Sequence, residues 1–394
     1  MRAISNKYLI LAALLFFILS SCDNSNELKK PDTGQDSSSA EYFSDPTDEK
    51  LAILLKVDTF PKINYNYLVI RDKQHLDSIR NAFPELKENP GLNKMFCLLN
   101  RKERRYLKIG DTVLVADSII NDIVAYSVFP LIYPEAKDIE KLVIVSNAYQ
   151  AYACYEFGKQ VRFAATNTGK EKTQTYPGRY AMVWKQELRL SSLDSTWKMP
   201  YTWNIHRFAG SAFHKFEMPG YPASHSCLRQ FMDDAKWLYD WGQGAKYDSN
   251  RVAIHLSGTP VLIIDHFDFR RPRTGPWVAL RSNKDTILKL PENPMEFEEA
   301  LIPISQIPKS TRGILPNRQK YLTAEDTLRA RGIIREGVRI TESVDFNEER
   351  RKKAARKAQA IEQKKSEEAI NQTSNPLDDE QIKKNLEELE GEPR

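Results

Sequence analysis

Short apolar runs at a regular spacing dominate the middle of the chain. Runs rich in Val, Ile, Tyr and Phe span residues 141–146, 151–157 and 160–165, with turn-forming residues between them. Strands at this rhythm are typical of a sheet that closes into a barrel or packs into a sandwich. We therefore expect a β-rich domain here.

One helix is expected to follow in the same region. Trp237, Leu238 and Trp241 fall on one face of a helix that starts at Asp233 or Asp234. An aspartate can cap a helix N-terminus, and Gly242 and Gly244 would end the helix. We expect the two tryptophans to belong to the core rather than to a ligand site.

Residues 51–135 carry enough apolar residues for a small α+β domain. The pattern predicts strands at 67–70 and within 106–115, and helices at 75–83 and 95–99. This region is the candidate for a separate binding or structural module.

The C-terminal part of the chain divides in two. Residues 267–346 form short segments separated by prolines, with a helix expected at 324–331, and read as an extension of the central domain. Residues 347–394 have mixed charge and few large apolar side chains, which predicts a solvated helix or a disordered tail. The basic residues 350–353 could contact anionic lipid or wall polymer, or simply form a solvated face.

The N-terminus has the pattern of a secretion signal. Arg2 and Lys7 precede an apolar run that is too short for a lasting membrane span and ends in Ser20-Ser21-Cys22. Residues 1–22 resemble a bacterial lipoprotein signal, which implies cleavage before Cys22 and lipidation of its thiol; an ordinary signal peptide is the alternative. The polar residues 23–50 would then be a disordered tether, and the lipid would hold the protein at a periplasm-facing membrane surface of the cell envelope.

Composition narrows the partners and the redox chemistry. A net charge of +5 over 394 residues is too mild to indicate nucleic-acid binding. Of the four cysteines, Cys97 and Cys154 could form one disulfide in an oxidising compartment, although sequence alone does not pair them.

The richest candidate chemistry lies in residues 212–229, AFHKFEMPGYPASHSCLR. This stretch contains His214, His225 and Cys227, and its prolines and glycine indicate a loop. A cysteine with an imidazole within reach can perform acyl transfer through a covalent intermediate. The alternatives are purely structural residues, or a zinc site for which no further ligand pair is present. We expect neither a metal nor a cofactor.

Several motifs in this part of the chain resemble those of the YkuD-like L,D-transpeptidase family. Ser224-His225-Ser226-Cys227-Leu228-Arg229 is similar to the family's S-H-G-C-x-R signature, and His214 stands where the family has its upstream histidine. The similarity extends over roughly residues 139–266 through four further stretches: Thr168-Gly169-Lys170, residues 175–180, residues 234–241 and Gly258-Thr259-Pro260-Val261. The resemblance implies a mainly β catalytic domain with a few helices, an α+β fold.

The resemblance also implies an activity and roles for residues. Cys227 would attack a peptidoglycan stem tetrapeptide and release its terminal D-alanine, and an amine of a second stem would resolve the acyl-enzyme. His214 would take the thiol proton, His225 would orient the loop, and backbone N–H groups near Cys227 would hold the oxyanion.

Three further residues would support this loop or bind substrate, and two alternatives stay open for the activity. The supporting residues are Ser224, Ser226 and Arg229, with the structural role slightly favoured for Arg229. The alternatives are a hydrolase or carboxypeptidase on the same scaffold, and a catalytically silent wall-binding lipoprotein.

Two departures from the family pattern carry expectations. Ser226 replaces the family's glycine, and if that position needs positive φ, serine costs on the order of 1 kcal/mol. Lys215 and Phe216 follow His214 in place of small residues, which indicates a remodelled loop.

In the N-terminal region, residues 107–115 weakly resemble a LysM glycan-binding module, so residues 51–135 have either a glycan-binding or a purely structural role.

Overall fold

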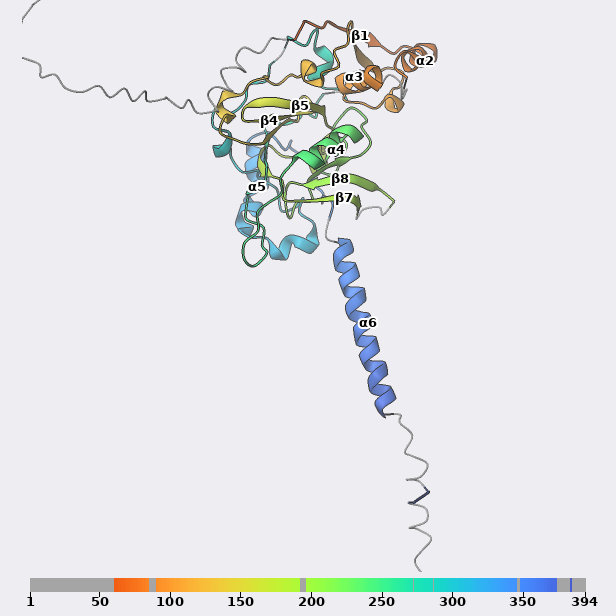
Figure 1. The fold of residues 1–394 in the computed structure, drawn as a ribbon, viewed down its shortest axis with the longest axis vertical. Coiled ribbons are helices and arrows are strands. Elements are labelled where there is room, and N and C mark those ends of the chain that lie inside the picture. Colours follow the sequence, from red (N-terminus) through yellow and green to blue (C-terminus); the bar gives the residue numbers. More distant parts are fainter. Residues whose placement is uncertain are drawn as a thin grey trace, which may run out of the picture. The chain divides into compact units, whose positions relative to one another are not determined.

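The computed structural model describes residues 60–84, 90–191, 196–271, 273–285, 287–345, 348–373 and 383–384 (Figure 1). The predicted signal peptide with Cys22 and the predicted tether lie outside these residues. Every described residue belongs to one compact unit, 45–394. Among the described helices, none is long and apolar enough to cross a membrane.

The elements predicted near the N-terminus are confirmed. Strand β1 (Tyr65–Val69) pairs antiparallel with β2 (Thr112–Ala116). Helices α2 (Lys73–Ala82) and α3 (Pro90–Asn100) lie between them in sequence. The Asp72 carboxylate accepts the His75 N–H at 2.7 Å and so caps α2.

The three predicted central strands form one side of a five-stranded sheet in the order β5-β4-β3-β11-β6. Strands β3, β4 and β5 are an antiparallel meander, while β11 runs parallel to β3 and antiparallel to β6. The strands span β3 Leu142–Ser146, β4 Ala151–Glu156, β5 Lys159–Ala165, β6 Gly178–Ala181 and β11 Pro260–Ile263.

A second sheet of four strands has the order β10-β9-β8-β7. Strands β7 and β8 form an antiparallel ribbon, and the short strands β9 and β10 are parallel. The bounds are β7 Trp184–Leu190, β8 Lys198–Asn204, β9 Ala212–Lys215 and β10 Leu228–Gln230. The candidate loop therefore connects two neighbouring parallel strands.

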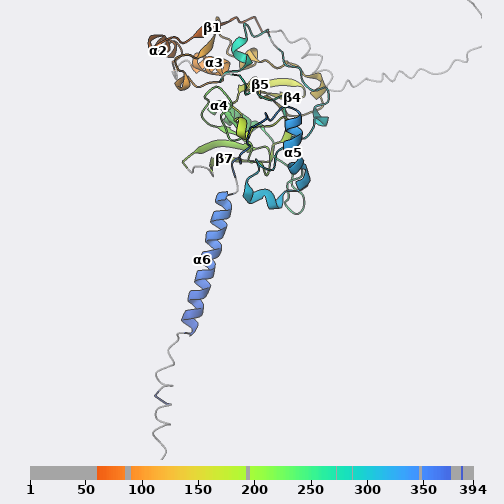
Figure 2. The same cartoon turned by 180° about the vertical axis from the view of Figure 1, so that it is seen from behind.

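The five-stranded sheet is buried on both faces, as alternate side chains of β3 demonstrate. Val143 and Val145 pack in one cluster with Trp203 and Phe213 of the second sheet. Leu142 and Ile144, with the opposite orientation, share another cluster with Leu98 of α3 and other N-terminal residues. Figures 1 and 2 show β4 and β5 between α3 and the β7–β8 ribbon. The result is a sandwich of two separate sheets rather than a closed barrel.

Helix α4 (Met232–Trp241) confirms the predicted helix but not its cap. The N-cap residue is Phe231, which makes no side-chain capping bond. Asp234 is buried in the first turn, where it accepts a hydrogen bond of 2.6 Å from Arg162. The helix ends at Gly242 as expected, and the stacked rings of Trp237 and Trp241 pack against the inter-sheet core.

The C-terminal residues form two longer helices. Helix α5 (Arg318–Ala330) starts six residues earlier than predicted; its first two residues are exposed and polar, whereas Tyr321 is buried. Helix α6 (Glu348–Thr373) is the helical form of the predicted charged tail, and its described side chains are exposed. Short 3-10 helices span Arg104–Tyr106, Ile123–Tyr126, Pro134–Ala136, Glu171–Thr173, Pro276–Ala279, Pro294–Glu296 and Lys309–Ile314.

The cysteines Cys97 and Cys154 are not joined. Cys97 lies in a cluster with α2, whereas Cys154 on β4 faces the core between the two sheets. No disulfide links the cysteines in the described part of the chain. The disulfide considered from the sequence is therefore not formed, because the two residues lie in different cores.

Candidate active site

The parallel pairing of β9 and β10 places His214 and Cys227 on one face. His214 is the register partner of Arg229, and Cys227 stands two residues before Arg229. Side chains two residues apart on an extended strand project to the same face, so Cys227 projects beside Ala212 and on the side of His214. Ala212 and Cys227 do pack in one buried cluster.

The Cys227 thiol is enclosed by backbone groups. Only 3% of the residue is exposed, and its Sγ–H donates to the Gly210 carbonyl oxygen at 3.5 Å. Burial raises the pKa of Cys227 to about 12, against the opposing effects of the Ala212 N–H and the Arg229 charge. The resting nucleophile candidate is therefore a protonated thiol.

His214 is held as a neutral base. Its Nδ1 lies 2.9 Å from the Lys215 carbonyl oxygen, and because a carbonyl can only accept, Nδ1 carries the proton. The Nε2 lone pair is then available to another group. Burial lowers the pKa of His214 to about 4, so the imidazole is neutral at pH 7.

His225 is paired with a cation that the sequence analysis left without a role. The Lys170 ammonium donates to His225 Nε2 at 2.8 Å, which fixes the imidazole proton on Nδ1. Burial and, after it, the charges of Lys170 and Arg229 lower the pKa of His225 to about 4. Lys170 belongs to the Thr168-Gly169-Lys170 motif, and that motif was the signal that could have identified it.

Ser226 has the backbone conformation that its glycine counterpart would favour. Its φ is +78°, in the left-handed region, so the expected conformational cost applies. The Ser226 hydroxyl lies 3.2 Å from that of Ser211, which gives it a buried partner. The backbone N–H groups of His225 and Ser226 have no acceptor within the part of the chain that the structure describes.

Two threonines upstream in the sequence donate hydrogen bonds to the backbone of the loop. Thr175 donates its hydroxyl to the Ser226 carbonyl at 3.1 Å, and Thr173 donates to the Ser224 carbonyl at 3.2 Å. The Ser224 hydroxyl in turn donates to the Cys227 carbonyl at 2.5 Å. Gly169 is required here because a Cβ at this position would lie 2.1 Å from the backbone carbonyl oxygen of Thr173.

The Arg229 guanidinium donates hydrogen bonds to the backbone of the loop. It donates to the carbonyls of Glu217 at 3.2 Å and Ala223 at 3.3 Å. It also lies 4.7 Å from the centre of the Phe216 ring. These contacts agree with a loop-supporting position rather than with an open carboxylate clamp.

Two aromatic rings adjoin the histidines: Phe216 lies beside His214, and Trp197, which the sequence analysis missed, lies beside His225. Phe216 packs edge-on to His214 at 5.7 Å between ring centres, and Trp197 lies 5.8 Å from Phe216. The Trp197 ring is also 6.5 Å from His225 and is 37% exposed. Trp197 is therefore a partly exposed neighbour of His225, and no local sequence signal pointed to it.

Residues that precede β3 in the sequence contact the other side of the loop. Glu103 N–H donates to the Met218 carbonyl at 2.8 Å, and Lys102 forms a β-bridge with Pro219. Asn167 connects both parts, since its amide donates to the Arg101 carbonyl at 3.1 Å and its oxygen accepts from Gly220 at 2.9 Å. The N-terminal region is thus built into the candidate site.

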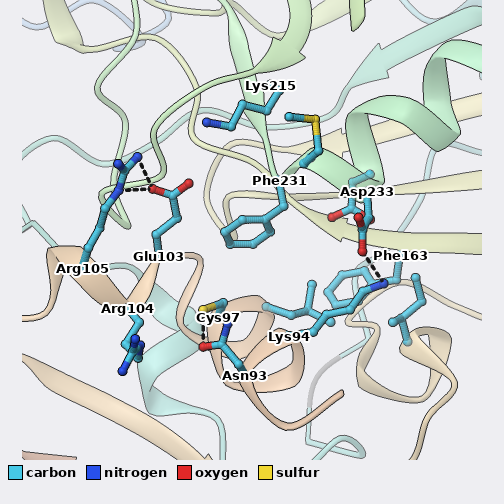
Figure 3. Close-up of a pocket in the computed structure, with 14 residues that line it drawn as sticks. Asn93, Lys94, Cys97, Glu103, Arg104, Arg105, Phe163, Lys215, Phe231 and Asp233 are labelled. Carbon is cyan, nitrogen blue, oxygen red and sulfur yellow. Dashed lines mark hydrogen bonds and ion pairs between the residues drawn. The ribbon is translucent and has the colours of Figure 1, made fainter. Parts of the chain in front are cut away.

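A cavity of about 520 Å³ lies apart from the thiol, between α3, residues 103–105, β5 and the start of α4 (Figure 3). In Figure 3 the Phe231 ring stands between the Arg105–Glu103 pair and Asp233. Lys215 lines this cavity, whereas Cys227, His214 and His225 do not. Within the described residues, no group of three or more His, Cys, Asp or Glu side chains is placed to hold a metal ion.

Comparison with known proteins gives one family match. Residues 140–263 match the family model of the YkuD L,D-transpeptidase catalytic domain, which confirms the resemblance seen in the sequence. No protein of curated function is significantly similar in sequence.

Similar solved structures are L,D-transpeptidases. That from Stackebrandtia nassauensis is 21% identical, with 32% of this chain and 57% of that chain covered and a TM-score of 0.26. That from Mycobacterium smegmatis is 18% identical, with coverages of 32% and 59% and a TM-score of 0.26. That from Xylanimonas cellulosilytica is 19% identical, with coverages of 52% and 100% and a TM-score of 0.30. This chain thus spans 57 to 59% of the length of the first two.

Proposed function

We propose that the YkuD-type L,D-transpeptidase domain at residues 140–263 makes this chain a peptidoglycan transpeptidase with Cys227 as its nucleophile. The observation that carries the proposal is the β9–β10 pairing, which sets a thiol and a neutral imidazole on one strand face. Acyl transfer through a thioester needs such a pair.

The first half-reaction transfers the acyl group to sulfur. Because the pKa of Cys227 is about 12, the thiol needs a base as it attacks, and Nε2 of His214 takes its proton. A C–S bond forms at the carbonyl carbon that joins the terminal D-alanine to the stem. The tetrahedral oxyanion collapses, the C–N bond breaks, and D-alanine leaves with the proton from His214.

The second half-reaction regenerates the free thiol of the enzyme. A side-chain amine of a second stem attacks the thioester, a new amide C–N bond forms and the C–S bond breaks. The proton lost by the amine passes through His214 to the sulfur. The free N–H groups of His225 and Ser226 support stabilisation of both oxyanions, since donors fixed in advance are effective at such a position.

The finer roles of the remaining residues follow from their contacts. His225, held by Lys170, orients the loop in front of Cys227, and Ser224, Ser226 and Arg229 keep that loop in place. The N-terminal lipid on Cys22 would anchor the enzyme to the membrane of the cell envelope. Replacement of Cys22 by Ser should release the protein from the membrane fraction.

We also propose glycan contact for the N-terminal region, at the cavity beside Phe231. An aromatic ring flanked by paired polar side chains suits a sugar, which offers apolar faces and hydroxyls. Arg105→Ala should weaken binding to soluble glycan strands. The control is Arg270→Ala, which removes another exposed, carboxylate-paired arginine that does not line the cavity. Equal binding by both variants would refute the contact.

The transpeptidase proposal is tested with a disaccharide-tetrapeptide, by following products and protein mass together. Crosslinked dimer with released D-alanine, both lost in Cys227→Ala, is the expected result. D-alanine or tripeptide without dimer would instead identify the hydrolase or carboxypeptidase. A folded protein with neither product nor acyl adduct would identify the silent wall-binding alternative.

A further inference from the structure

The C-terminal extension packs against the candidate active site through Val344. Residues 341–345, termed the strap, connect the α5 region to the start of α6. Val344 is buried in the same cluster as Cys227, Ala212 and Met199. The strap is more than a hundred residues away in sequence, yet it packs in the thiol's own cluster.

The strap also meets the backbone group that holds the thiol. Cys227 donates to the Gly210 carbonyl, and a Cβ on Gly210 would lie only 1.8 Å from the Val344 carbonyl oxygen. Gly210 and Val344 are therefore in direct backbone contact. The strap backbone at Val344 thus lies against the residue whose carbonyl accepts the thiol hydrogen bond.

Side chains and backbone groups of the strap hold it down at several points. Ser343 donates its N–H to the Gln306 carbonyl at 2.9 Å, and the carbonyl oxygens of Ala209 and Gln306 share the single proton of its hydroxyl. Thr341 N–H donates to the Lys172 carbonyl at 2.9 Å. The strap is thus bonded to the segments before β9 and after the Thr168-Gly169-Lys170 motif, which both belong to the site.

The fastening is polar and partly exposed, which suits a closure that can open. The Glu342 carboxylate accepts the Lys309 N–H at 3.0 Å and lies 3.6 Å from the Arg312 guanidinium. Asp345 accepts from Ser310. Only Val344 contributes a buried apolar contact, so few apolar groups would be exposed when the strap lifts.

We propose that the strap is a closure over Cys227, and that it lifts away from Gly210 and Met199 to admit the stem peptide. This inference rests on the proposed function for the identity of the substrate, but the closure itself does not depend on turnover. The strap then sets access to the thiol, and the residue pair that controls it is Ser343 and Val344.

The test measures alkylation of individual cysteines by iodoacetamide in the full folded chain, with peptide-level mass spectrometry. Ser343→Ala removes the hydroxyl bonds, and Val344→Ala removes the apolar contact with the thiol cluster. Each change should accelerate Cys227 alkylation roughly tenfold, since one such bond or contact shifts an opening equilibrium by about that factor. Ser257→Ala, which removes a hydroxyl bond to Ile254 away from the strap, should leave the rate unchanged.

Cys154 serves as the internal control for general unfolding. It is fully buried between the two sheets, so it should stay unlabelled in every variant if only the strap opens. Parallel acceleration at Cys154 and Cys227 would overturn the proposal, as would rapid Cys227 labelling in the unaltered protein that neither strap change increases. Faster labelling without any product from the tetrapeptide would keep the strap and reject the transpeptidase. Crosslinked product with unchanged labelling would reject the strap closure and keep the transpeptidase.

Discussion

The Lys170 ammonium donates a hydrogen bond to Nε2 of His225 at 2.8 Å, next to the loop that presents Cys227. A histidine that accepts from a lysine is neutral and cannot act as an acid at that nitrogen. This contact separates the roles of the two histidines, because only His214 keeps its Nε2 for another group.

Lys170→Met should lower the rate of D-alanine release roughly tenfold, because His225 then loses the partner that orients it. The pKa of His225 should also rise from about 4, since one of the charges that lowers it is gone. Imidazole titration by NMR measures the second effect, which a merely structural loss would not produce. Lys172→Met, two residues on and exposed, is the matched control, and equal behaviour of the two variants would contradict the role of Lys170.

The strain at Ser226 can be separated from its hydrogen bond with three variants. Ser226→Ala and Ser211→Ala each lose the hydroxyl contact and should lower the free energy of unfolding by about 1 kcal/mol. Ser226→Gly loses the same contact but relieves the positive φ, so it should be about 1 kcal/mol more stable than Ser226→Ala. Urea unfolding measures all three. No difference between the glycine and alanine variants would show that the backbone is unstrained.

Stability should fall as the pH drops from about 6.5 towards 4. Burial lowers the pKa of His206, His214 and His225 to about 4, whereas the unfolded chain binds these protons near pH 6.5. In that window the unfolded state holds more protons, so the free energy of unfolding decreases as the pH falls. The midpoints of urea unfolding at pH 7.5 and pH 5 measure this decrease in stability. His206→Gln, outside the candidate site, should reduce the pH dependence, and an unchanged dependence would contradict the assignment.

The buried pair of Arg162 and Asp234 should be sensitive to neutralisation. Asp234→Asn leaves the Arg162 charge without its partner in a site where the two side chains are 14% and 5% exposed. A loss of about 3–5 kcal/mol in the free energy of unfolding is expected. Asp233→Asn is the adjacent control: its side chain is 72% exposed, so the loss should stay below about 1 kcal/mol. Similar losses in both variants would refute the argument.

The regular strands and the helix α4 were predictable because their signals are local. Runs of Val, Ile and Tyr in β3 to β5 have the composition of buried strands, and Gly242 marks a helix end. The prediction that Asp233 or Asp234 caps this helix was wrong, and for Asp234 the reason is physical. Arg162 precedes Asp234 by 72 residues in the sequence. Its buried guanidinium needs a carboxylate partner, and pairing with Asp234 outweighs the capping of the helix N-terminus.

The sequence singled out the candidate residues of the site but not the residues that surround them. Cys227, His214 and His225 stand out by residue type within one short loop. Trp197 and Val344 reach the same loop from distant segments, and each looks like an ordinary apolar residue in its own sequence context. Contacts of this kind depend on the tertiary packing of the sheets, which no local pattern encodes.

The bridge between Lys102 and Pro219 has a consequence for how this protein could be altered by recombination. The segment that carries Lys102 precedes the family domain, yet it supports the backbone that leads to Cys227. A chimera that joins a foreign N-terminal segment to residues 140–263 would inherit the Cys227 thiol without the support for its loop. The two halves of the chain are therefore expected to change together during evolution, as a single inherited unit.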